Sequence, residues 1–189
     1  MIKNKIMVMN INVEIFYFIN NGLSNPFFDF IMPRISDLGG LTFMAILCVV
    51  LLIASRKNVF NLGRYYGLVK LMACAIILTV IITAPLKLMF SQPRPFLILG
   101  HVNVLTSSAD PNSFPSGHSA TTLSVMTVLF LKAKEYFTKE TFVKCFAVVF
   151  SATIMFSRIY IGMHFPLDVA VGTAIGIASG RLACRFLKV

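Results

Sequence analysis

The chain has 189 residues, of which 57% are hydrophobic and only 13% charged, and its formal net charge is +10. A soluble domain carries about 25% charged residues, so this composition argues against a soluble protein and favours a bilayer as the solvent. An excess of Lys and Arg can indicate a nucleic-acid partner, but here the basic residues stand between apolar runs. We therefore expect one membrane domain over residues 1–189 and no nucleic-acid binding.

Apolar runs recur along the chain, and a membrane-spanning helix needs about 20 mostly apolar residues. The first run, residues 11–31, is interrupted by several Asn residues, a Gly and a Pro, so it either spans the bilayer or lies in its interface. Five stronger runs follow, at residues 38–55, 65–86, 117–131, 141–162 and 165–187. The prediction is an all-α, multi-pass membrane helix bundle of about six helices.

The basic residues are divided unevenly between the two ends of these expected helices. If residues 11–31 cross the bilayer, thirteen of the seventeen Lys and Arg residues fall on one side, and if they do not, eleven do. Cytoplasmic loops accumulate Lys and Arg, so the basic side is expected to be cytoplasmic. The long polar connection between residues 94 and 115 then lies outside the cytoplasm, and the expected location is the cell membrane.

Three segments that meet on the sparsely charged side carry the chemistry. They read KLMFSQPRP from residue 87, FPSGHS from residue 114 and SRIYIGMHFPLD from residue 157. A charge kept at membrane depth is by default a functional hypothesis. Here Lys87, Arg94 and Arg158 would converge, and three cations together form a site for a multiply charged anion.

The other polar residues of these motifs suit the same anion. Pro115 and Gly117 favour a tight helix start whose unpaired N–H groups point outward. His164 and Asp168 are four residues apart, so they share one face if the chain is helical from residue 165 onward. Asp168 could then accept a hydrogen bond from one imidazole nitrogen and leave the other free to attack.

Together these groups match the requirements of phosphoryl transfer: cations over the phosphate oxygens, a nucleophile and an acid for the leaving oxygen. Metal-ligand patterns are not visible. The chain has three His and seven acidic residues, which are widely spread and form no H-E-x-x-H run or paired carboxylates. No metal or other cofactor is therefore expected.

In order and spacing, the motifs resemble the three-part signature of the type-2 phosphatidic-acid phosphatase superfamily. The chain has K-x6-R-P from residue 87, P-S-G-H from residue 115 and S-R-x5-H-x3-D from residue 157. The resemblance covers residues 87–168 by motif. The order of the helices is similar to that of the six-helix membrane members.

The resemblance implies roles for individual residues and a reaction without a metal cofactor. His164 is expected to form a phosphohistidine, Asp168 to orient it, and His118 to protonate the departing lipid oxygen and later to activate water. The residues expected to bind the phosphate are Lys87, Arg94, Ser116, Gly117 and Arg158.

The resemblance leaves the lipid open. Short members with an outward-facing site often act on isoprenoid diphosphates such as undecaprenyl diphosphate, which we favour, or on phosphatidate and phosphatidylglycerophosphate. A non-catalytic lipid-phosphate binder or transporter would also use a cationic pocket between helices, but it needs no nucleophile with an orienting carboxylate. The sequence does not specify an oligomeric state.

Overall fold

The computed structural model describes residues 2–108 and 110–187, with side chains from residue 11 onward. Lys188, one of the basic residues counted above, lies outside them. The described residues form helices and one isolated antiparallel bridge between Pro93 and Asn112. The helices are α1 (Ile2–Asn20), α2 (Pro26–Leu38), α3 (Leu41–Arg56), the 3-10 helix η1 (Val59–Tyr65), α4 (Tyr66–Phe90), α5 (Pro95–Ile98), α6 (Gly117–Tyr136), α7 (Glu140–Tyr160) and α8 (Pro166–Phe186).

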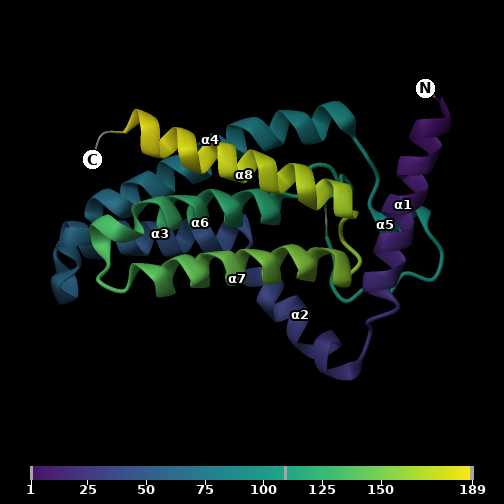
Figure 1. The fold of residues 1–189 in the computed structure, drawn as a ribbon, viewed down its shortest axis with the longest axis horizontal. Coiled ribbons are helices and arrows are strands. Elements are labelled where there is room, and N and C mark those ends of the chain that lie inside the picture. The colour runs from purple at the N-terminus through teal and green to yellow at the C-terminus, as the bar shows by residue number, and fades with distance from the viewer. Residues whose placement is uncertain (1, 109, 188–189) are drawn as a thin grey trace.

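Five of these helices, α3, α4, α6, α7 and α8, form the bundle (Figure 1). α6 is its central element and packs against α4, α7 and α8. The predicted all-α bundle is therefore confirmed. Most expected ends are correct to within a few residues, but the first strong run begins later, because Gly39 and Gly40 separate α2 from α3.

By length and composition, the described residues contain three helices that could each cross a membrane, namely α4 with η1, α7 and α8. α2 and α3 together make a fourth candidate, a span bent by 50°. α6 differs because it faces protein on several sides. Its first turns carry buried polar residues, Ser119, Thr121, Thr122 and Ser124, which suit the interior of a bundle better than lipid.

The first apolar run, residues 11–31, is not one helix. α1 ends at Asn20, and α2 begins at Pro26 with the side chain of Asn25 accepting a hydrogen bond from the Phe28 N–H. α1 runs across one end of the bundle (Figure 1), where Phe16 packs against Phe165. Of the two expectations for this run, the arrangement of α1 fits the interfacial one.

α8 and α6 meet along a seam of small residues. A Cβ atom added to Gly172, Gly176 or Gly180 would lie within 2.7 Å of a carbonyl oxygen of α6 or of its N-cap residue Ser116. Only glycine therefore lets the two backbones approach so closely, as the G-x-x-x-G spacing predicts. The seam begins where both helices start, and this brings the second and third motifs together.

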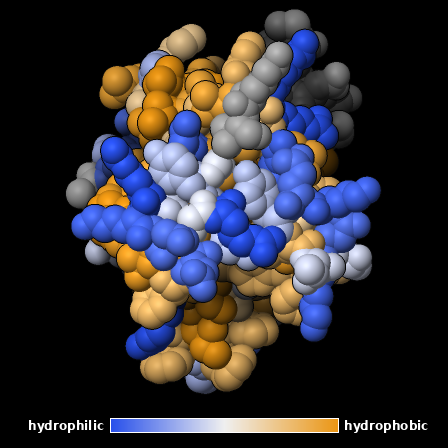
Figure 2. All heavy atoms as spheres, turned by 90° about the vertical axis from the view of Figure 1, so that its left-hand side faces the viewer, coloured by the Kyte–Doolittle hydropathy of each residue, from blue (hydrophilic) through white to orange (hydrophobic). Residues whose placement is uncertain are grey.

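The two ends of the bundle differ in charge. Figure 2 views the end that holds η1, the α6–α7 connection and the last turns of α8, and hydrophilic side chains gather there. The basic residues at this end are Arg56, Lys57, Arg64, Lys132, Lys134, Lys139, Arg181 and Arg185. Lys87, Arg94 and Arg158 lie at the opposite end, and so does α1, which carries two of the counted lysines (Figure 1). The division of the described basic residues therefore follows the smaller of the two predicted counts, the one in which residues 11–31 do not cross.

Candidate active site

The predicted site residues come together at the end of the bundle where α4 and α7 finish and α6 and α8 begin. A cavity of about 640 Å³ opens there. The predicted residues that line it are Lys87, Arg94, Gly117, His118 and His164. Leu41 and Ile46 of α3 contribute an apolar wall, and both are exposed on the outer surface of the bundle. The cavity thus joins cationic and imidazole groups to a surface that faces lipid.

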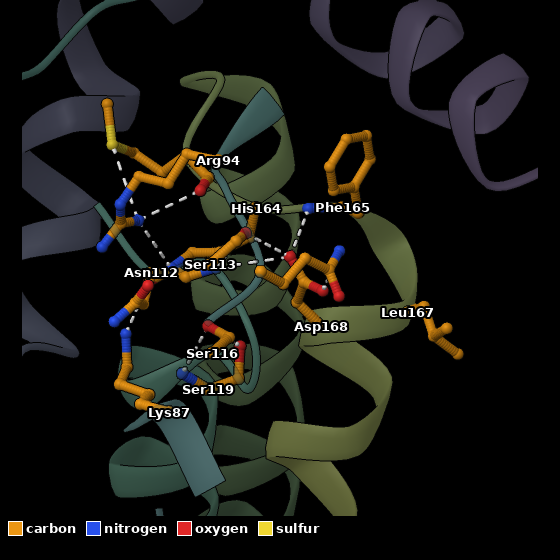
Figure 3. Close-up of polar contacts among 12 residues, drawn as sticks. Lys87, Arg94, Asn112, Ser113, Ser116, Ser119, His164, Phe165, Leu167 and Asp168 are labelled. Carbon is orange, nitrogen blue, oxygen red and sulfur yellow. Dashed lines mark hydrogen bonds and ion pairs between the residues drawn. The ribbon is translucent and has the colours of Figure 1, made fainter. Parts of the chain in front are cut away.

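His164 lies in the short connection between α7 and α8, and its side chain is buried. Its Nε2 atom lies 3.2 Å from Nη1 of Arg94 (Figure 3). A guanidinium can only donate, so we assign the lone pair to Nε2 and the proton to Nδ1. Nε2 is therefore the nitrogen that can attack.

Nδ1 of His164 does not bond directly to Asp168. The distance from Nδ1 to Oδ2 of Asp168 is 3.7 Å, which is too long for a hydrogen bond. The hydroxyl of Ser113 lies between them (Figure 3), 3.3 Å from Nδ1, and donates to Oδ2. The expected direct contact is thus corrected to an indirect one, because a loop residue inserts between the two.

The first-motif cations share an acidic partner, Asp110. Nζ of Lys87 lies 2.7 Å from Oδ2 of Asp110 and 2.8 Å from the Asn112 carbonyl oxygen. Nε of Arg94 donates to the backbone oxygen of Asp110 at 2.7 Å, and its Nη2 lies 3.8 Å from the carboxylate. Desolvation acts to raise the pKa of Asp110, but the bonds from Lys87 and the Asn112 N–H outweigh it and hold that pKa below its usual value.

Arg158 lies near the end of α7, where it is buried, and it is not among the residues that line the cavity. Its Nη1 donates to the hydroxyl of Ser36 on α2. Among the residues that the structure describes, its Nε has no hydrogen-bond partner. A buried donor of this kind is a costly feature unless it serves a ligand or a water molecule.

The second motif forms the start of α6. His118 lines the cavity, close enough to Gly40 that a Cβ atom there would lie 3.2 Å from its Nε2. Gly117 also faces the cavity, and nothing lies within 4 Å of where its Cβ would be. Ser116 is buried as the N-cap of α6, where its hydroxyl accepts from the Ser119 N–H at 3.4 Å. Its oxygen therefore accepts hydrogen bonds from the first turn of its own helix.

The electrostatics of the cavity favour an unprotonated His164. Burial is the main cause that lowers its pKa well below that of an ordinary histidine, and Arg158, Arg94 and Lys87 lower it further. Within the described part of the chain, no three His, Cys, Asp or Glu side chains are grouped so that they could hold a metal ion. The hydrogen-bond donors around the cavity are mostly cationic side chains, and these suit an anionic ligand.

Sequence reasoning did not identify Asp110, Ser113 or Ser36 as neighbours of the site. Asp110 carried a signal, because it is the only acidic residue between Asp37 and Glu135 and falls in the long polar connection. Nothing in the sequence distinguishes Ser113 or Ser36 from the other serines. Their positions depend on how a loop and α2 fold onto the bundle.

Comparison with known proteins decides the family. A family model described as the PAP2 superfamily matches residues 68–188. The chain belongs to the PAP2 superfamily. It is 30% identical over 180 residues to the undecaprenyl-diphosphatase BcrC of Bacillus subtilis, and the match covers 93% of this chain and 83% of that protein. The chain is therefore a multi-pass membrane enzyme, a phosphatase of the PAP2 lipid phosphatase family.

Two solved structures share this fold. The crystal structure of Aquifex aeolicus LpxE matches with a TM-score of 0.75 and 31% identity, over 93% of this chain and 96% of that one. A transmembrane PAP2-type phosphatidylglycerolphosphate phosphatase from Bacillus subtilis matches with a TM-score of 0.79 and 22% identity, over 95% and 86% of the two chains. The second likeness concerns the fold alone.

Proposed function

We propose that the protein hydrolyses an isoprenoid diphosphate of the undecaprenyl type to the monophosphate and inorganic phosphate. The observation that carries this proposal is the single cavity that joins Lys87, Arg94, His118 and His164 to the apolar wall of α3. A diphosphate headgroup suits the cations, and a long apolar tail suits the lipid-facing side. The similarity to an undecaprenyl-diphosphatase over most of both chains supports the substrate class.

In the first step, the lone pair on Nε2 of His164 attacks the terminal phosphorus. The bond from phosphorus to the bridging oxygen breaks, and that oxygen takes a proton from His118 as the lipid monophosphate leaves. The phosphoryl group is then held on His164 as a phosphohistidine. The role of Asp168 is to keep the imidazole oriented, with its proton on Nδ1.

In the second step, water attacks the phosphorus of the phosphohistidine. His118 takes the proton of that water, the bond from phosphorus to Nε2 breaks, and its electron pair returns to the imidazole. Inorganic phosphate leaves, and both histidines regain their starting protonation states. This chemistry needs charge neutralisation and positioning more than any further reactive group.

The phosphoryl oxygens need donors on several sides. We assign the donor role to Lys87, Arg94 and Arg158. The N–H groups at the start of α6, near Gly117, add the positive end of a helix dipole. The partnerless Nε of Arg158 fits such a role. Ser116 contributes by holding this helix start, since its hydroxyl caps α6.

We further propose that the protein lies in the cell membrane with this cavity on the extracytoplasmic side. The end of the bundle opposite the cavity carries most of the described basic residues (Figure 2). Lys and Arg gather on the cytoplasmic side of membrane proteins, which supports this orientation.

The direct test is phosphate release by the purified protein in detergent, with undecaprenyl diphosphate, phosphatidate and phosphatidylglycerophosphate compared at equal concentrations. Undecaprenyl diphosphate should give the highest kcat/KM, and His164→Ala should release no phosphate from any of them. Faster hydrolysis of either phospholipid would reassign the substrate. Lipid binding or translocation by wild-type protein without phosphate release would instead indicate a non-catalytic binder or transporter.

A further inference from the structure

Ser113 is the residue that bridges the two members of the third motif. Its side chain is fully buried, its Oγ lies 3.3 Å from Nδ1 of His164, and it donates a hydrogen bond to Oδ2 of Asp168 (Figure 3). The same oxygen of Asp168 accepts the Phe165 N–H at 2.9 Å. The carboxylate is thus held by donors other than the imidazole.

The backbone places Ser113 at this point. Its N–H donates to the Gln92 carbonyl oxygen at 2.7 Å, and the neighbouring residue Asn112 forms the isolated bridge with Pro93. The loop before α6 is therefore tied to the segment between Lys87 and Arg94. Because of this tie, the first motif also fixes the hydroxyl that lies against His164.

The direction of the hydrogen bonds follows from the donors. Arg94 donates to Nε2, so the neutral imidazole carries its proton on Nδ1 and can donate it to Ser113 Oγ. Ser113 in turn donates its hydroxyl proton to Asp168. The hydrogen bonds thus run without a break from Nδ1–H of His164 to Oγ of Ser113, and from the Ser113 hydroxyl to the carboxylate of Asp168.

We infer that Ser113 is a positioning residue, which transmits the negative charge of Asp168 to Nδ1 of His164 and fixes the plane of the ring. This inference rests on the proposed function. When Nε2 bonds to phosphorus, the ring becomes cationic, and the polarised chain of hydrogen bonds stabilises that charge without moving a proton. A hydrogen bond to a charged group is worth enough to change kcat by about 10- to 100-fold.

The test uses two variants of nearly equal shape, Ser113→Thr and Ser113→Val, so that any steric effect of the added methyl group is shared and only the hydroxyl differs. Ser113→Ala removes the hydroxyl without adding volume. The Thr variant should exceed the Val variant at least about tenfold in kcat, with KM within about twofold. The Ala variant should lose kcat while keeping KM and its thermal unfolding temperature in detergent.

The pH profile gives a readout that a structural role would not change. The Ser113 hydroxyl links the negative charge of Asp168 to Nδ1 of His164, and a nearby negative charge raises the pKa of an imidazole, so loss of the hydroxyl should move the acid limb of kcat/KM to lower pH. Ser124→Ala is the matched control, because Ser124 is an equally buried serine whose hydroxyl bonds within α6. It should keep wild-type kcat and the wild-type acid limb.

Equal kcat for the Thr and Val variants, or an Ala variant with wild-type kcat, would overturn the inference about Ser113. Such a result leaves the proposed function standing if wild-type protein releases phosphate and His164→Ala does not. Failure of the proposed function shows separately, as wild-type protein that releases no phosphate from undecaprenyl diphosphate.

Discussion

Nζ of Lys87 and the carboxylate of Asp110 form an ion pair of 2.7 Å, and both residues line the candidate cavity. The carboxylate also lies 3.8 Å from Arg94, and its side chain is 45% exposed, so it sits between solvent and both cations of the first motif. A phosphate oxygen bound by those cations would need the same donors. We therefore expect Asp110 to compete with the proposed phosphate group for these cations.

Asp110→Asn should strengthen anion binding. The amide keeps an acceptor for Lys87 but removes the negative charge, so KM for the lipid and the inhibition constant of inorganic phosphate should both fall about two- to fivefold, the range expected for a partly exposed ion pair. The pKa of Asp110 is held below its usual value, so the carboxylate stays ionised and the effect should persist from about pH 5 to 8.

Glu135→Gln is the control for Asp110→Asn, since it removes the acid of the exposed Lys132–Glu135 ion pair on α6, away from the catalytic cavity. It should leave the KM for the lipid and the inhibition constant of inorganic phosphate unchanged. A rise in KM for Asp110→Asn would instead mean that the carboxylate holds Lys87 and Arg94 in place.

The pKa of His164 predicts where activity is lost in acid. As the proposed nucleophile, His164 must be unprotonated, and burial together with the surrounding cations lowers its pKa, so its neutral form persists below the pH at which an ordinary histidine becomes protonated. The acid limb of kcat/KM should therefore lie below about pH 6.5. Lys87→Gln removes one of these cations and should move the limb to higher pH. A limb that arises from ionisation of the substrate would stay in place.

The proposed orientation can be tested by cysteine labelling in a Cys145→Ser background, because Cys145 is exposed. Ser107 is exposed in the polar connection before α6, whereas Glu135 is exposed near the end of that helix. A membrane-impermeant maleimide should label Ser107→Cys in intact cells and Glu135→Cys only after permeabilisation. The opposite pattern would place the cavity in the cytoplasm.

The sequence predicted the helical bundle and the convergence of the motifs because both depend on local, repeated signals. Apolar length indicates helices, and strict alternation of direction puts the ends of α4 and α7 beside the starts of α6 and α8. The tight start of α6 followed from Pro115 and Gly117, and the close seam followed from the spacing of three glycines.

Other features could not be predicted, because they depend on loops and on packing between distant segments. The position of Ser113 is set by a backbone bond to Gln92, and that of Ser36 by the packing of α2 on α7. α6 is less apolar than a helix that faces lipid. Its serines and threonines are buried by neighbouring helices, and the sequence of α6 alone does not show which helices those are.

The seam between α6 and α8 offers a test of how the site is held together. A Cβ atom on Gly176 would lie 2.4 Å from the Ala120 carbonyl oxygen and 2.7 Å from the Leu123 side chain, so Gly176→Ala must push the helices apart. Overpacking of this kind costs about 1–3 kcal/mol, and thermal unfolding in detergent should show the loss.

Gly100→Ala is the matched control, because nothing lies within 4 Å of the Cβ position there, and it should unfold at the wild-type temperature. Since the seam also sets the distance between the start of α6 and Asp168, where the Ser116 N–H donates to the Asp168 carbonyl oxygen at 3.0 Å, Gly176→Ala should lower kcat as well. Unchanged stability together with unchanged kcat would show that the backbones can separate without disturbing the site.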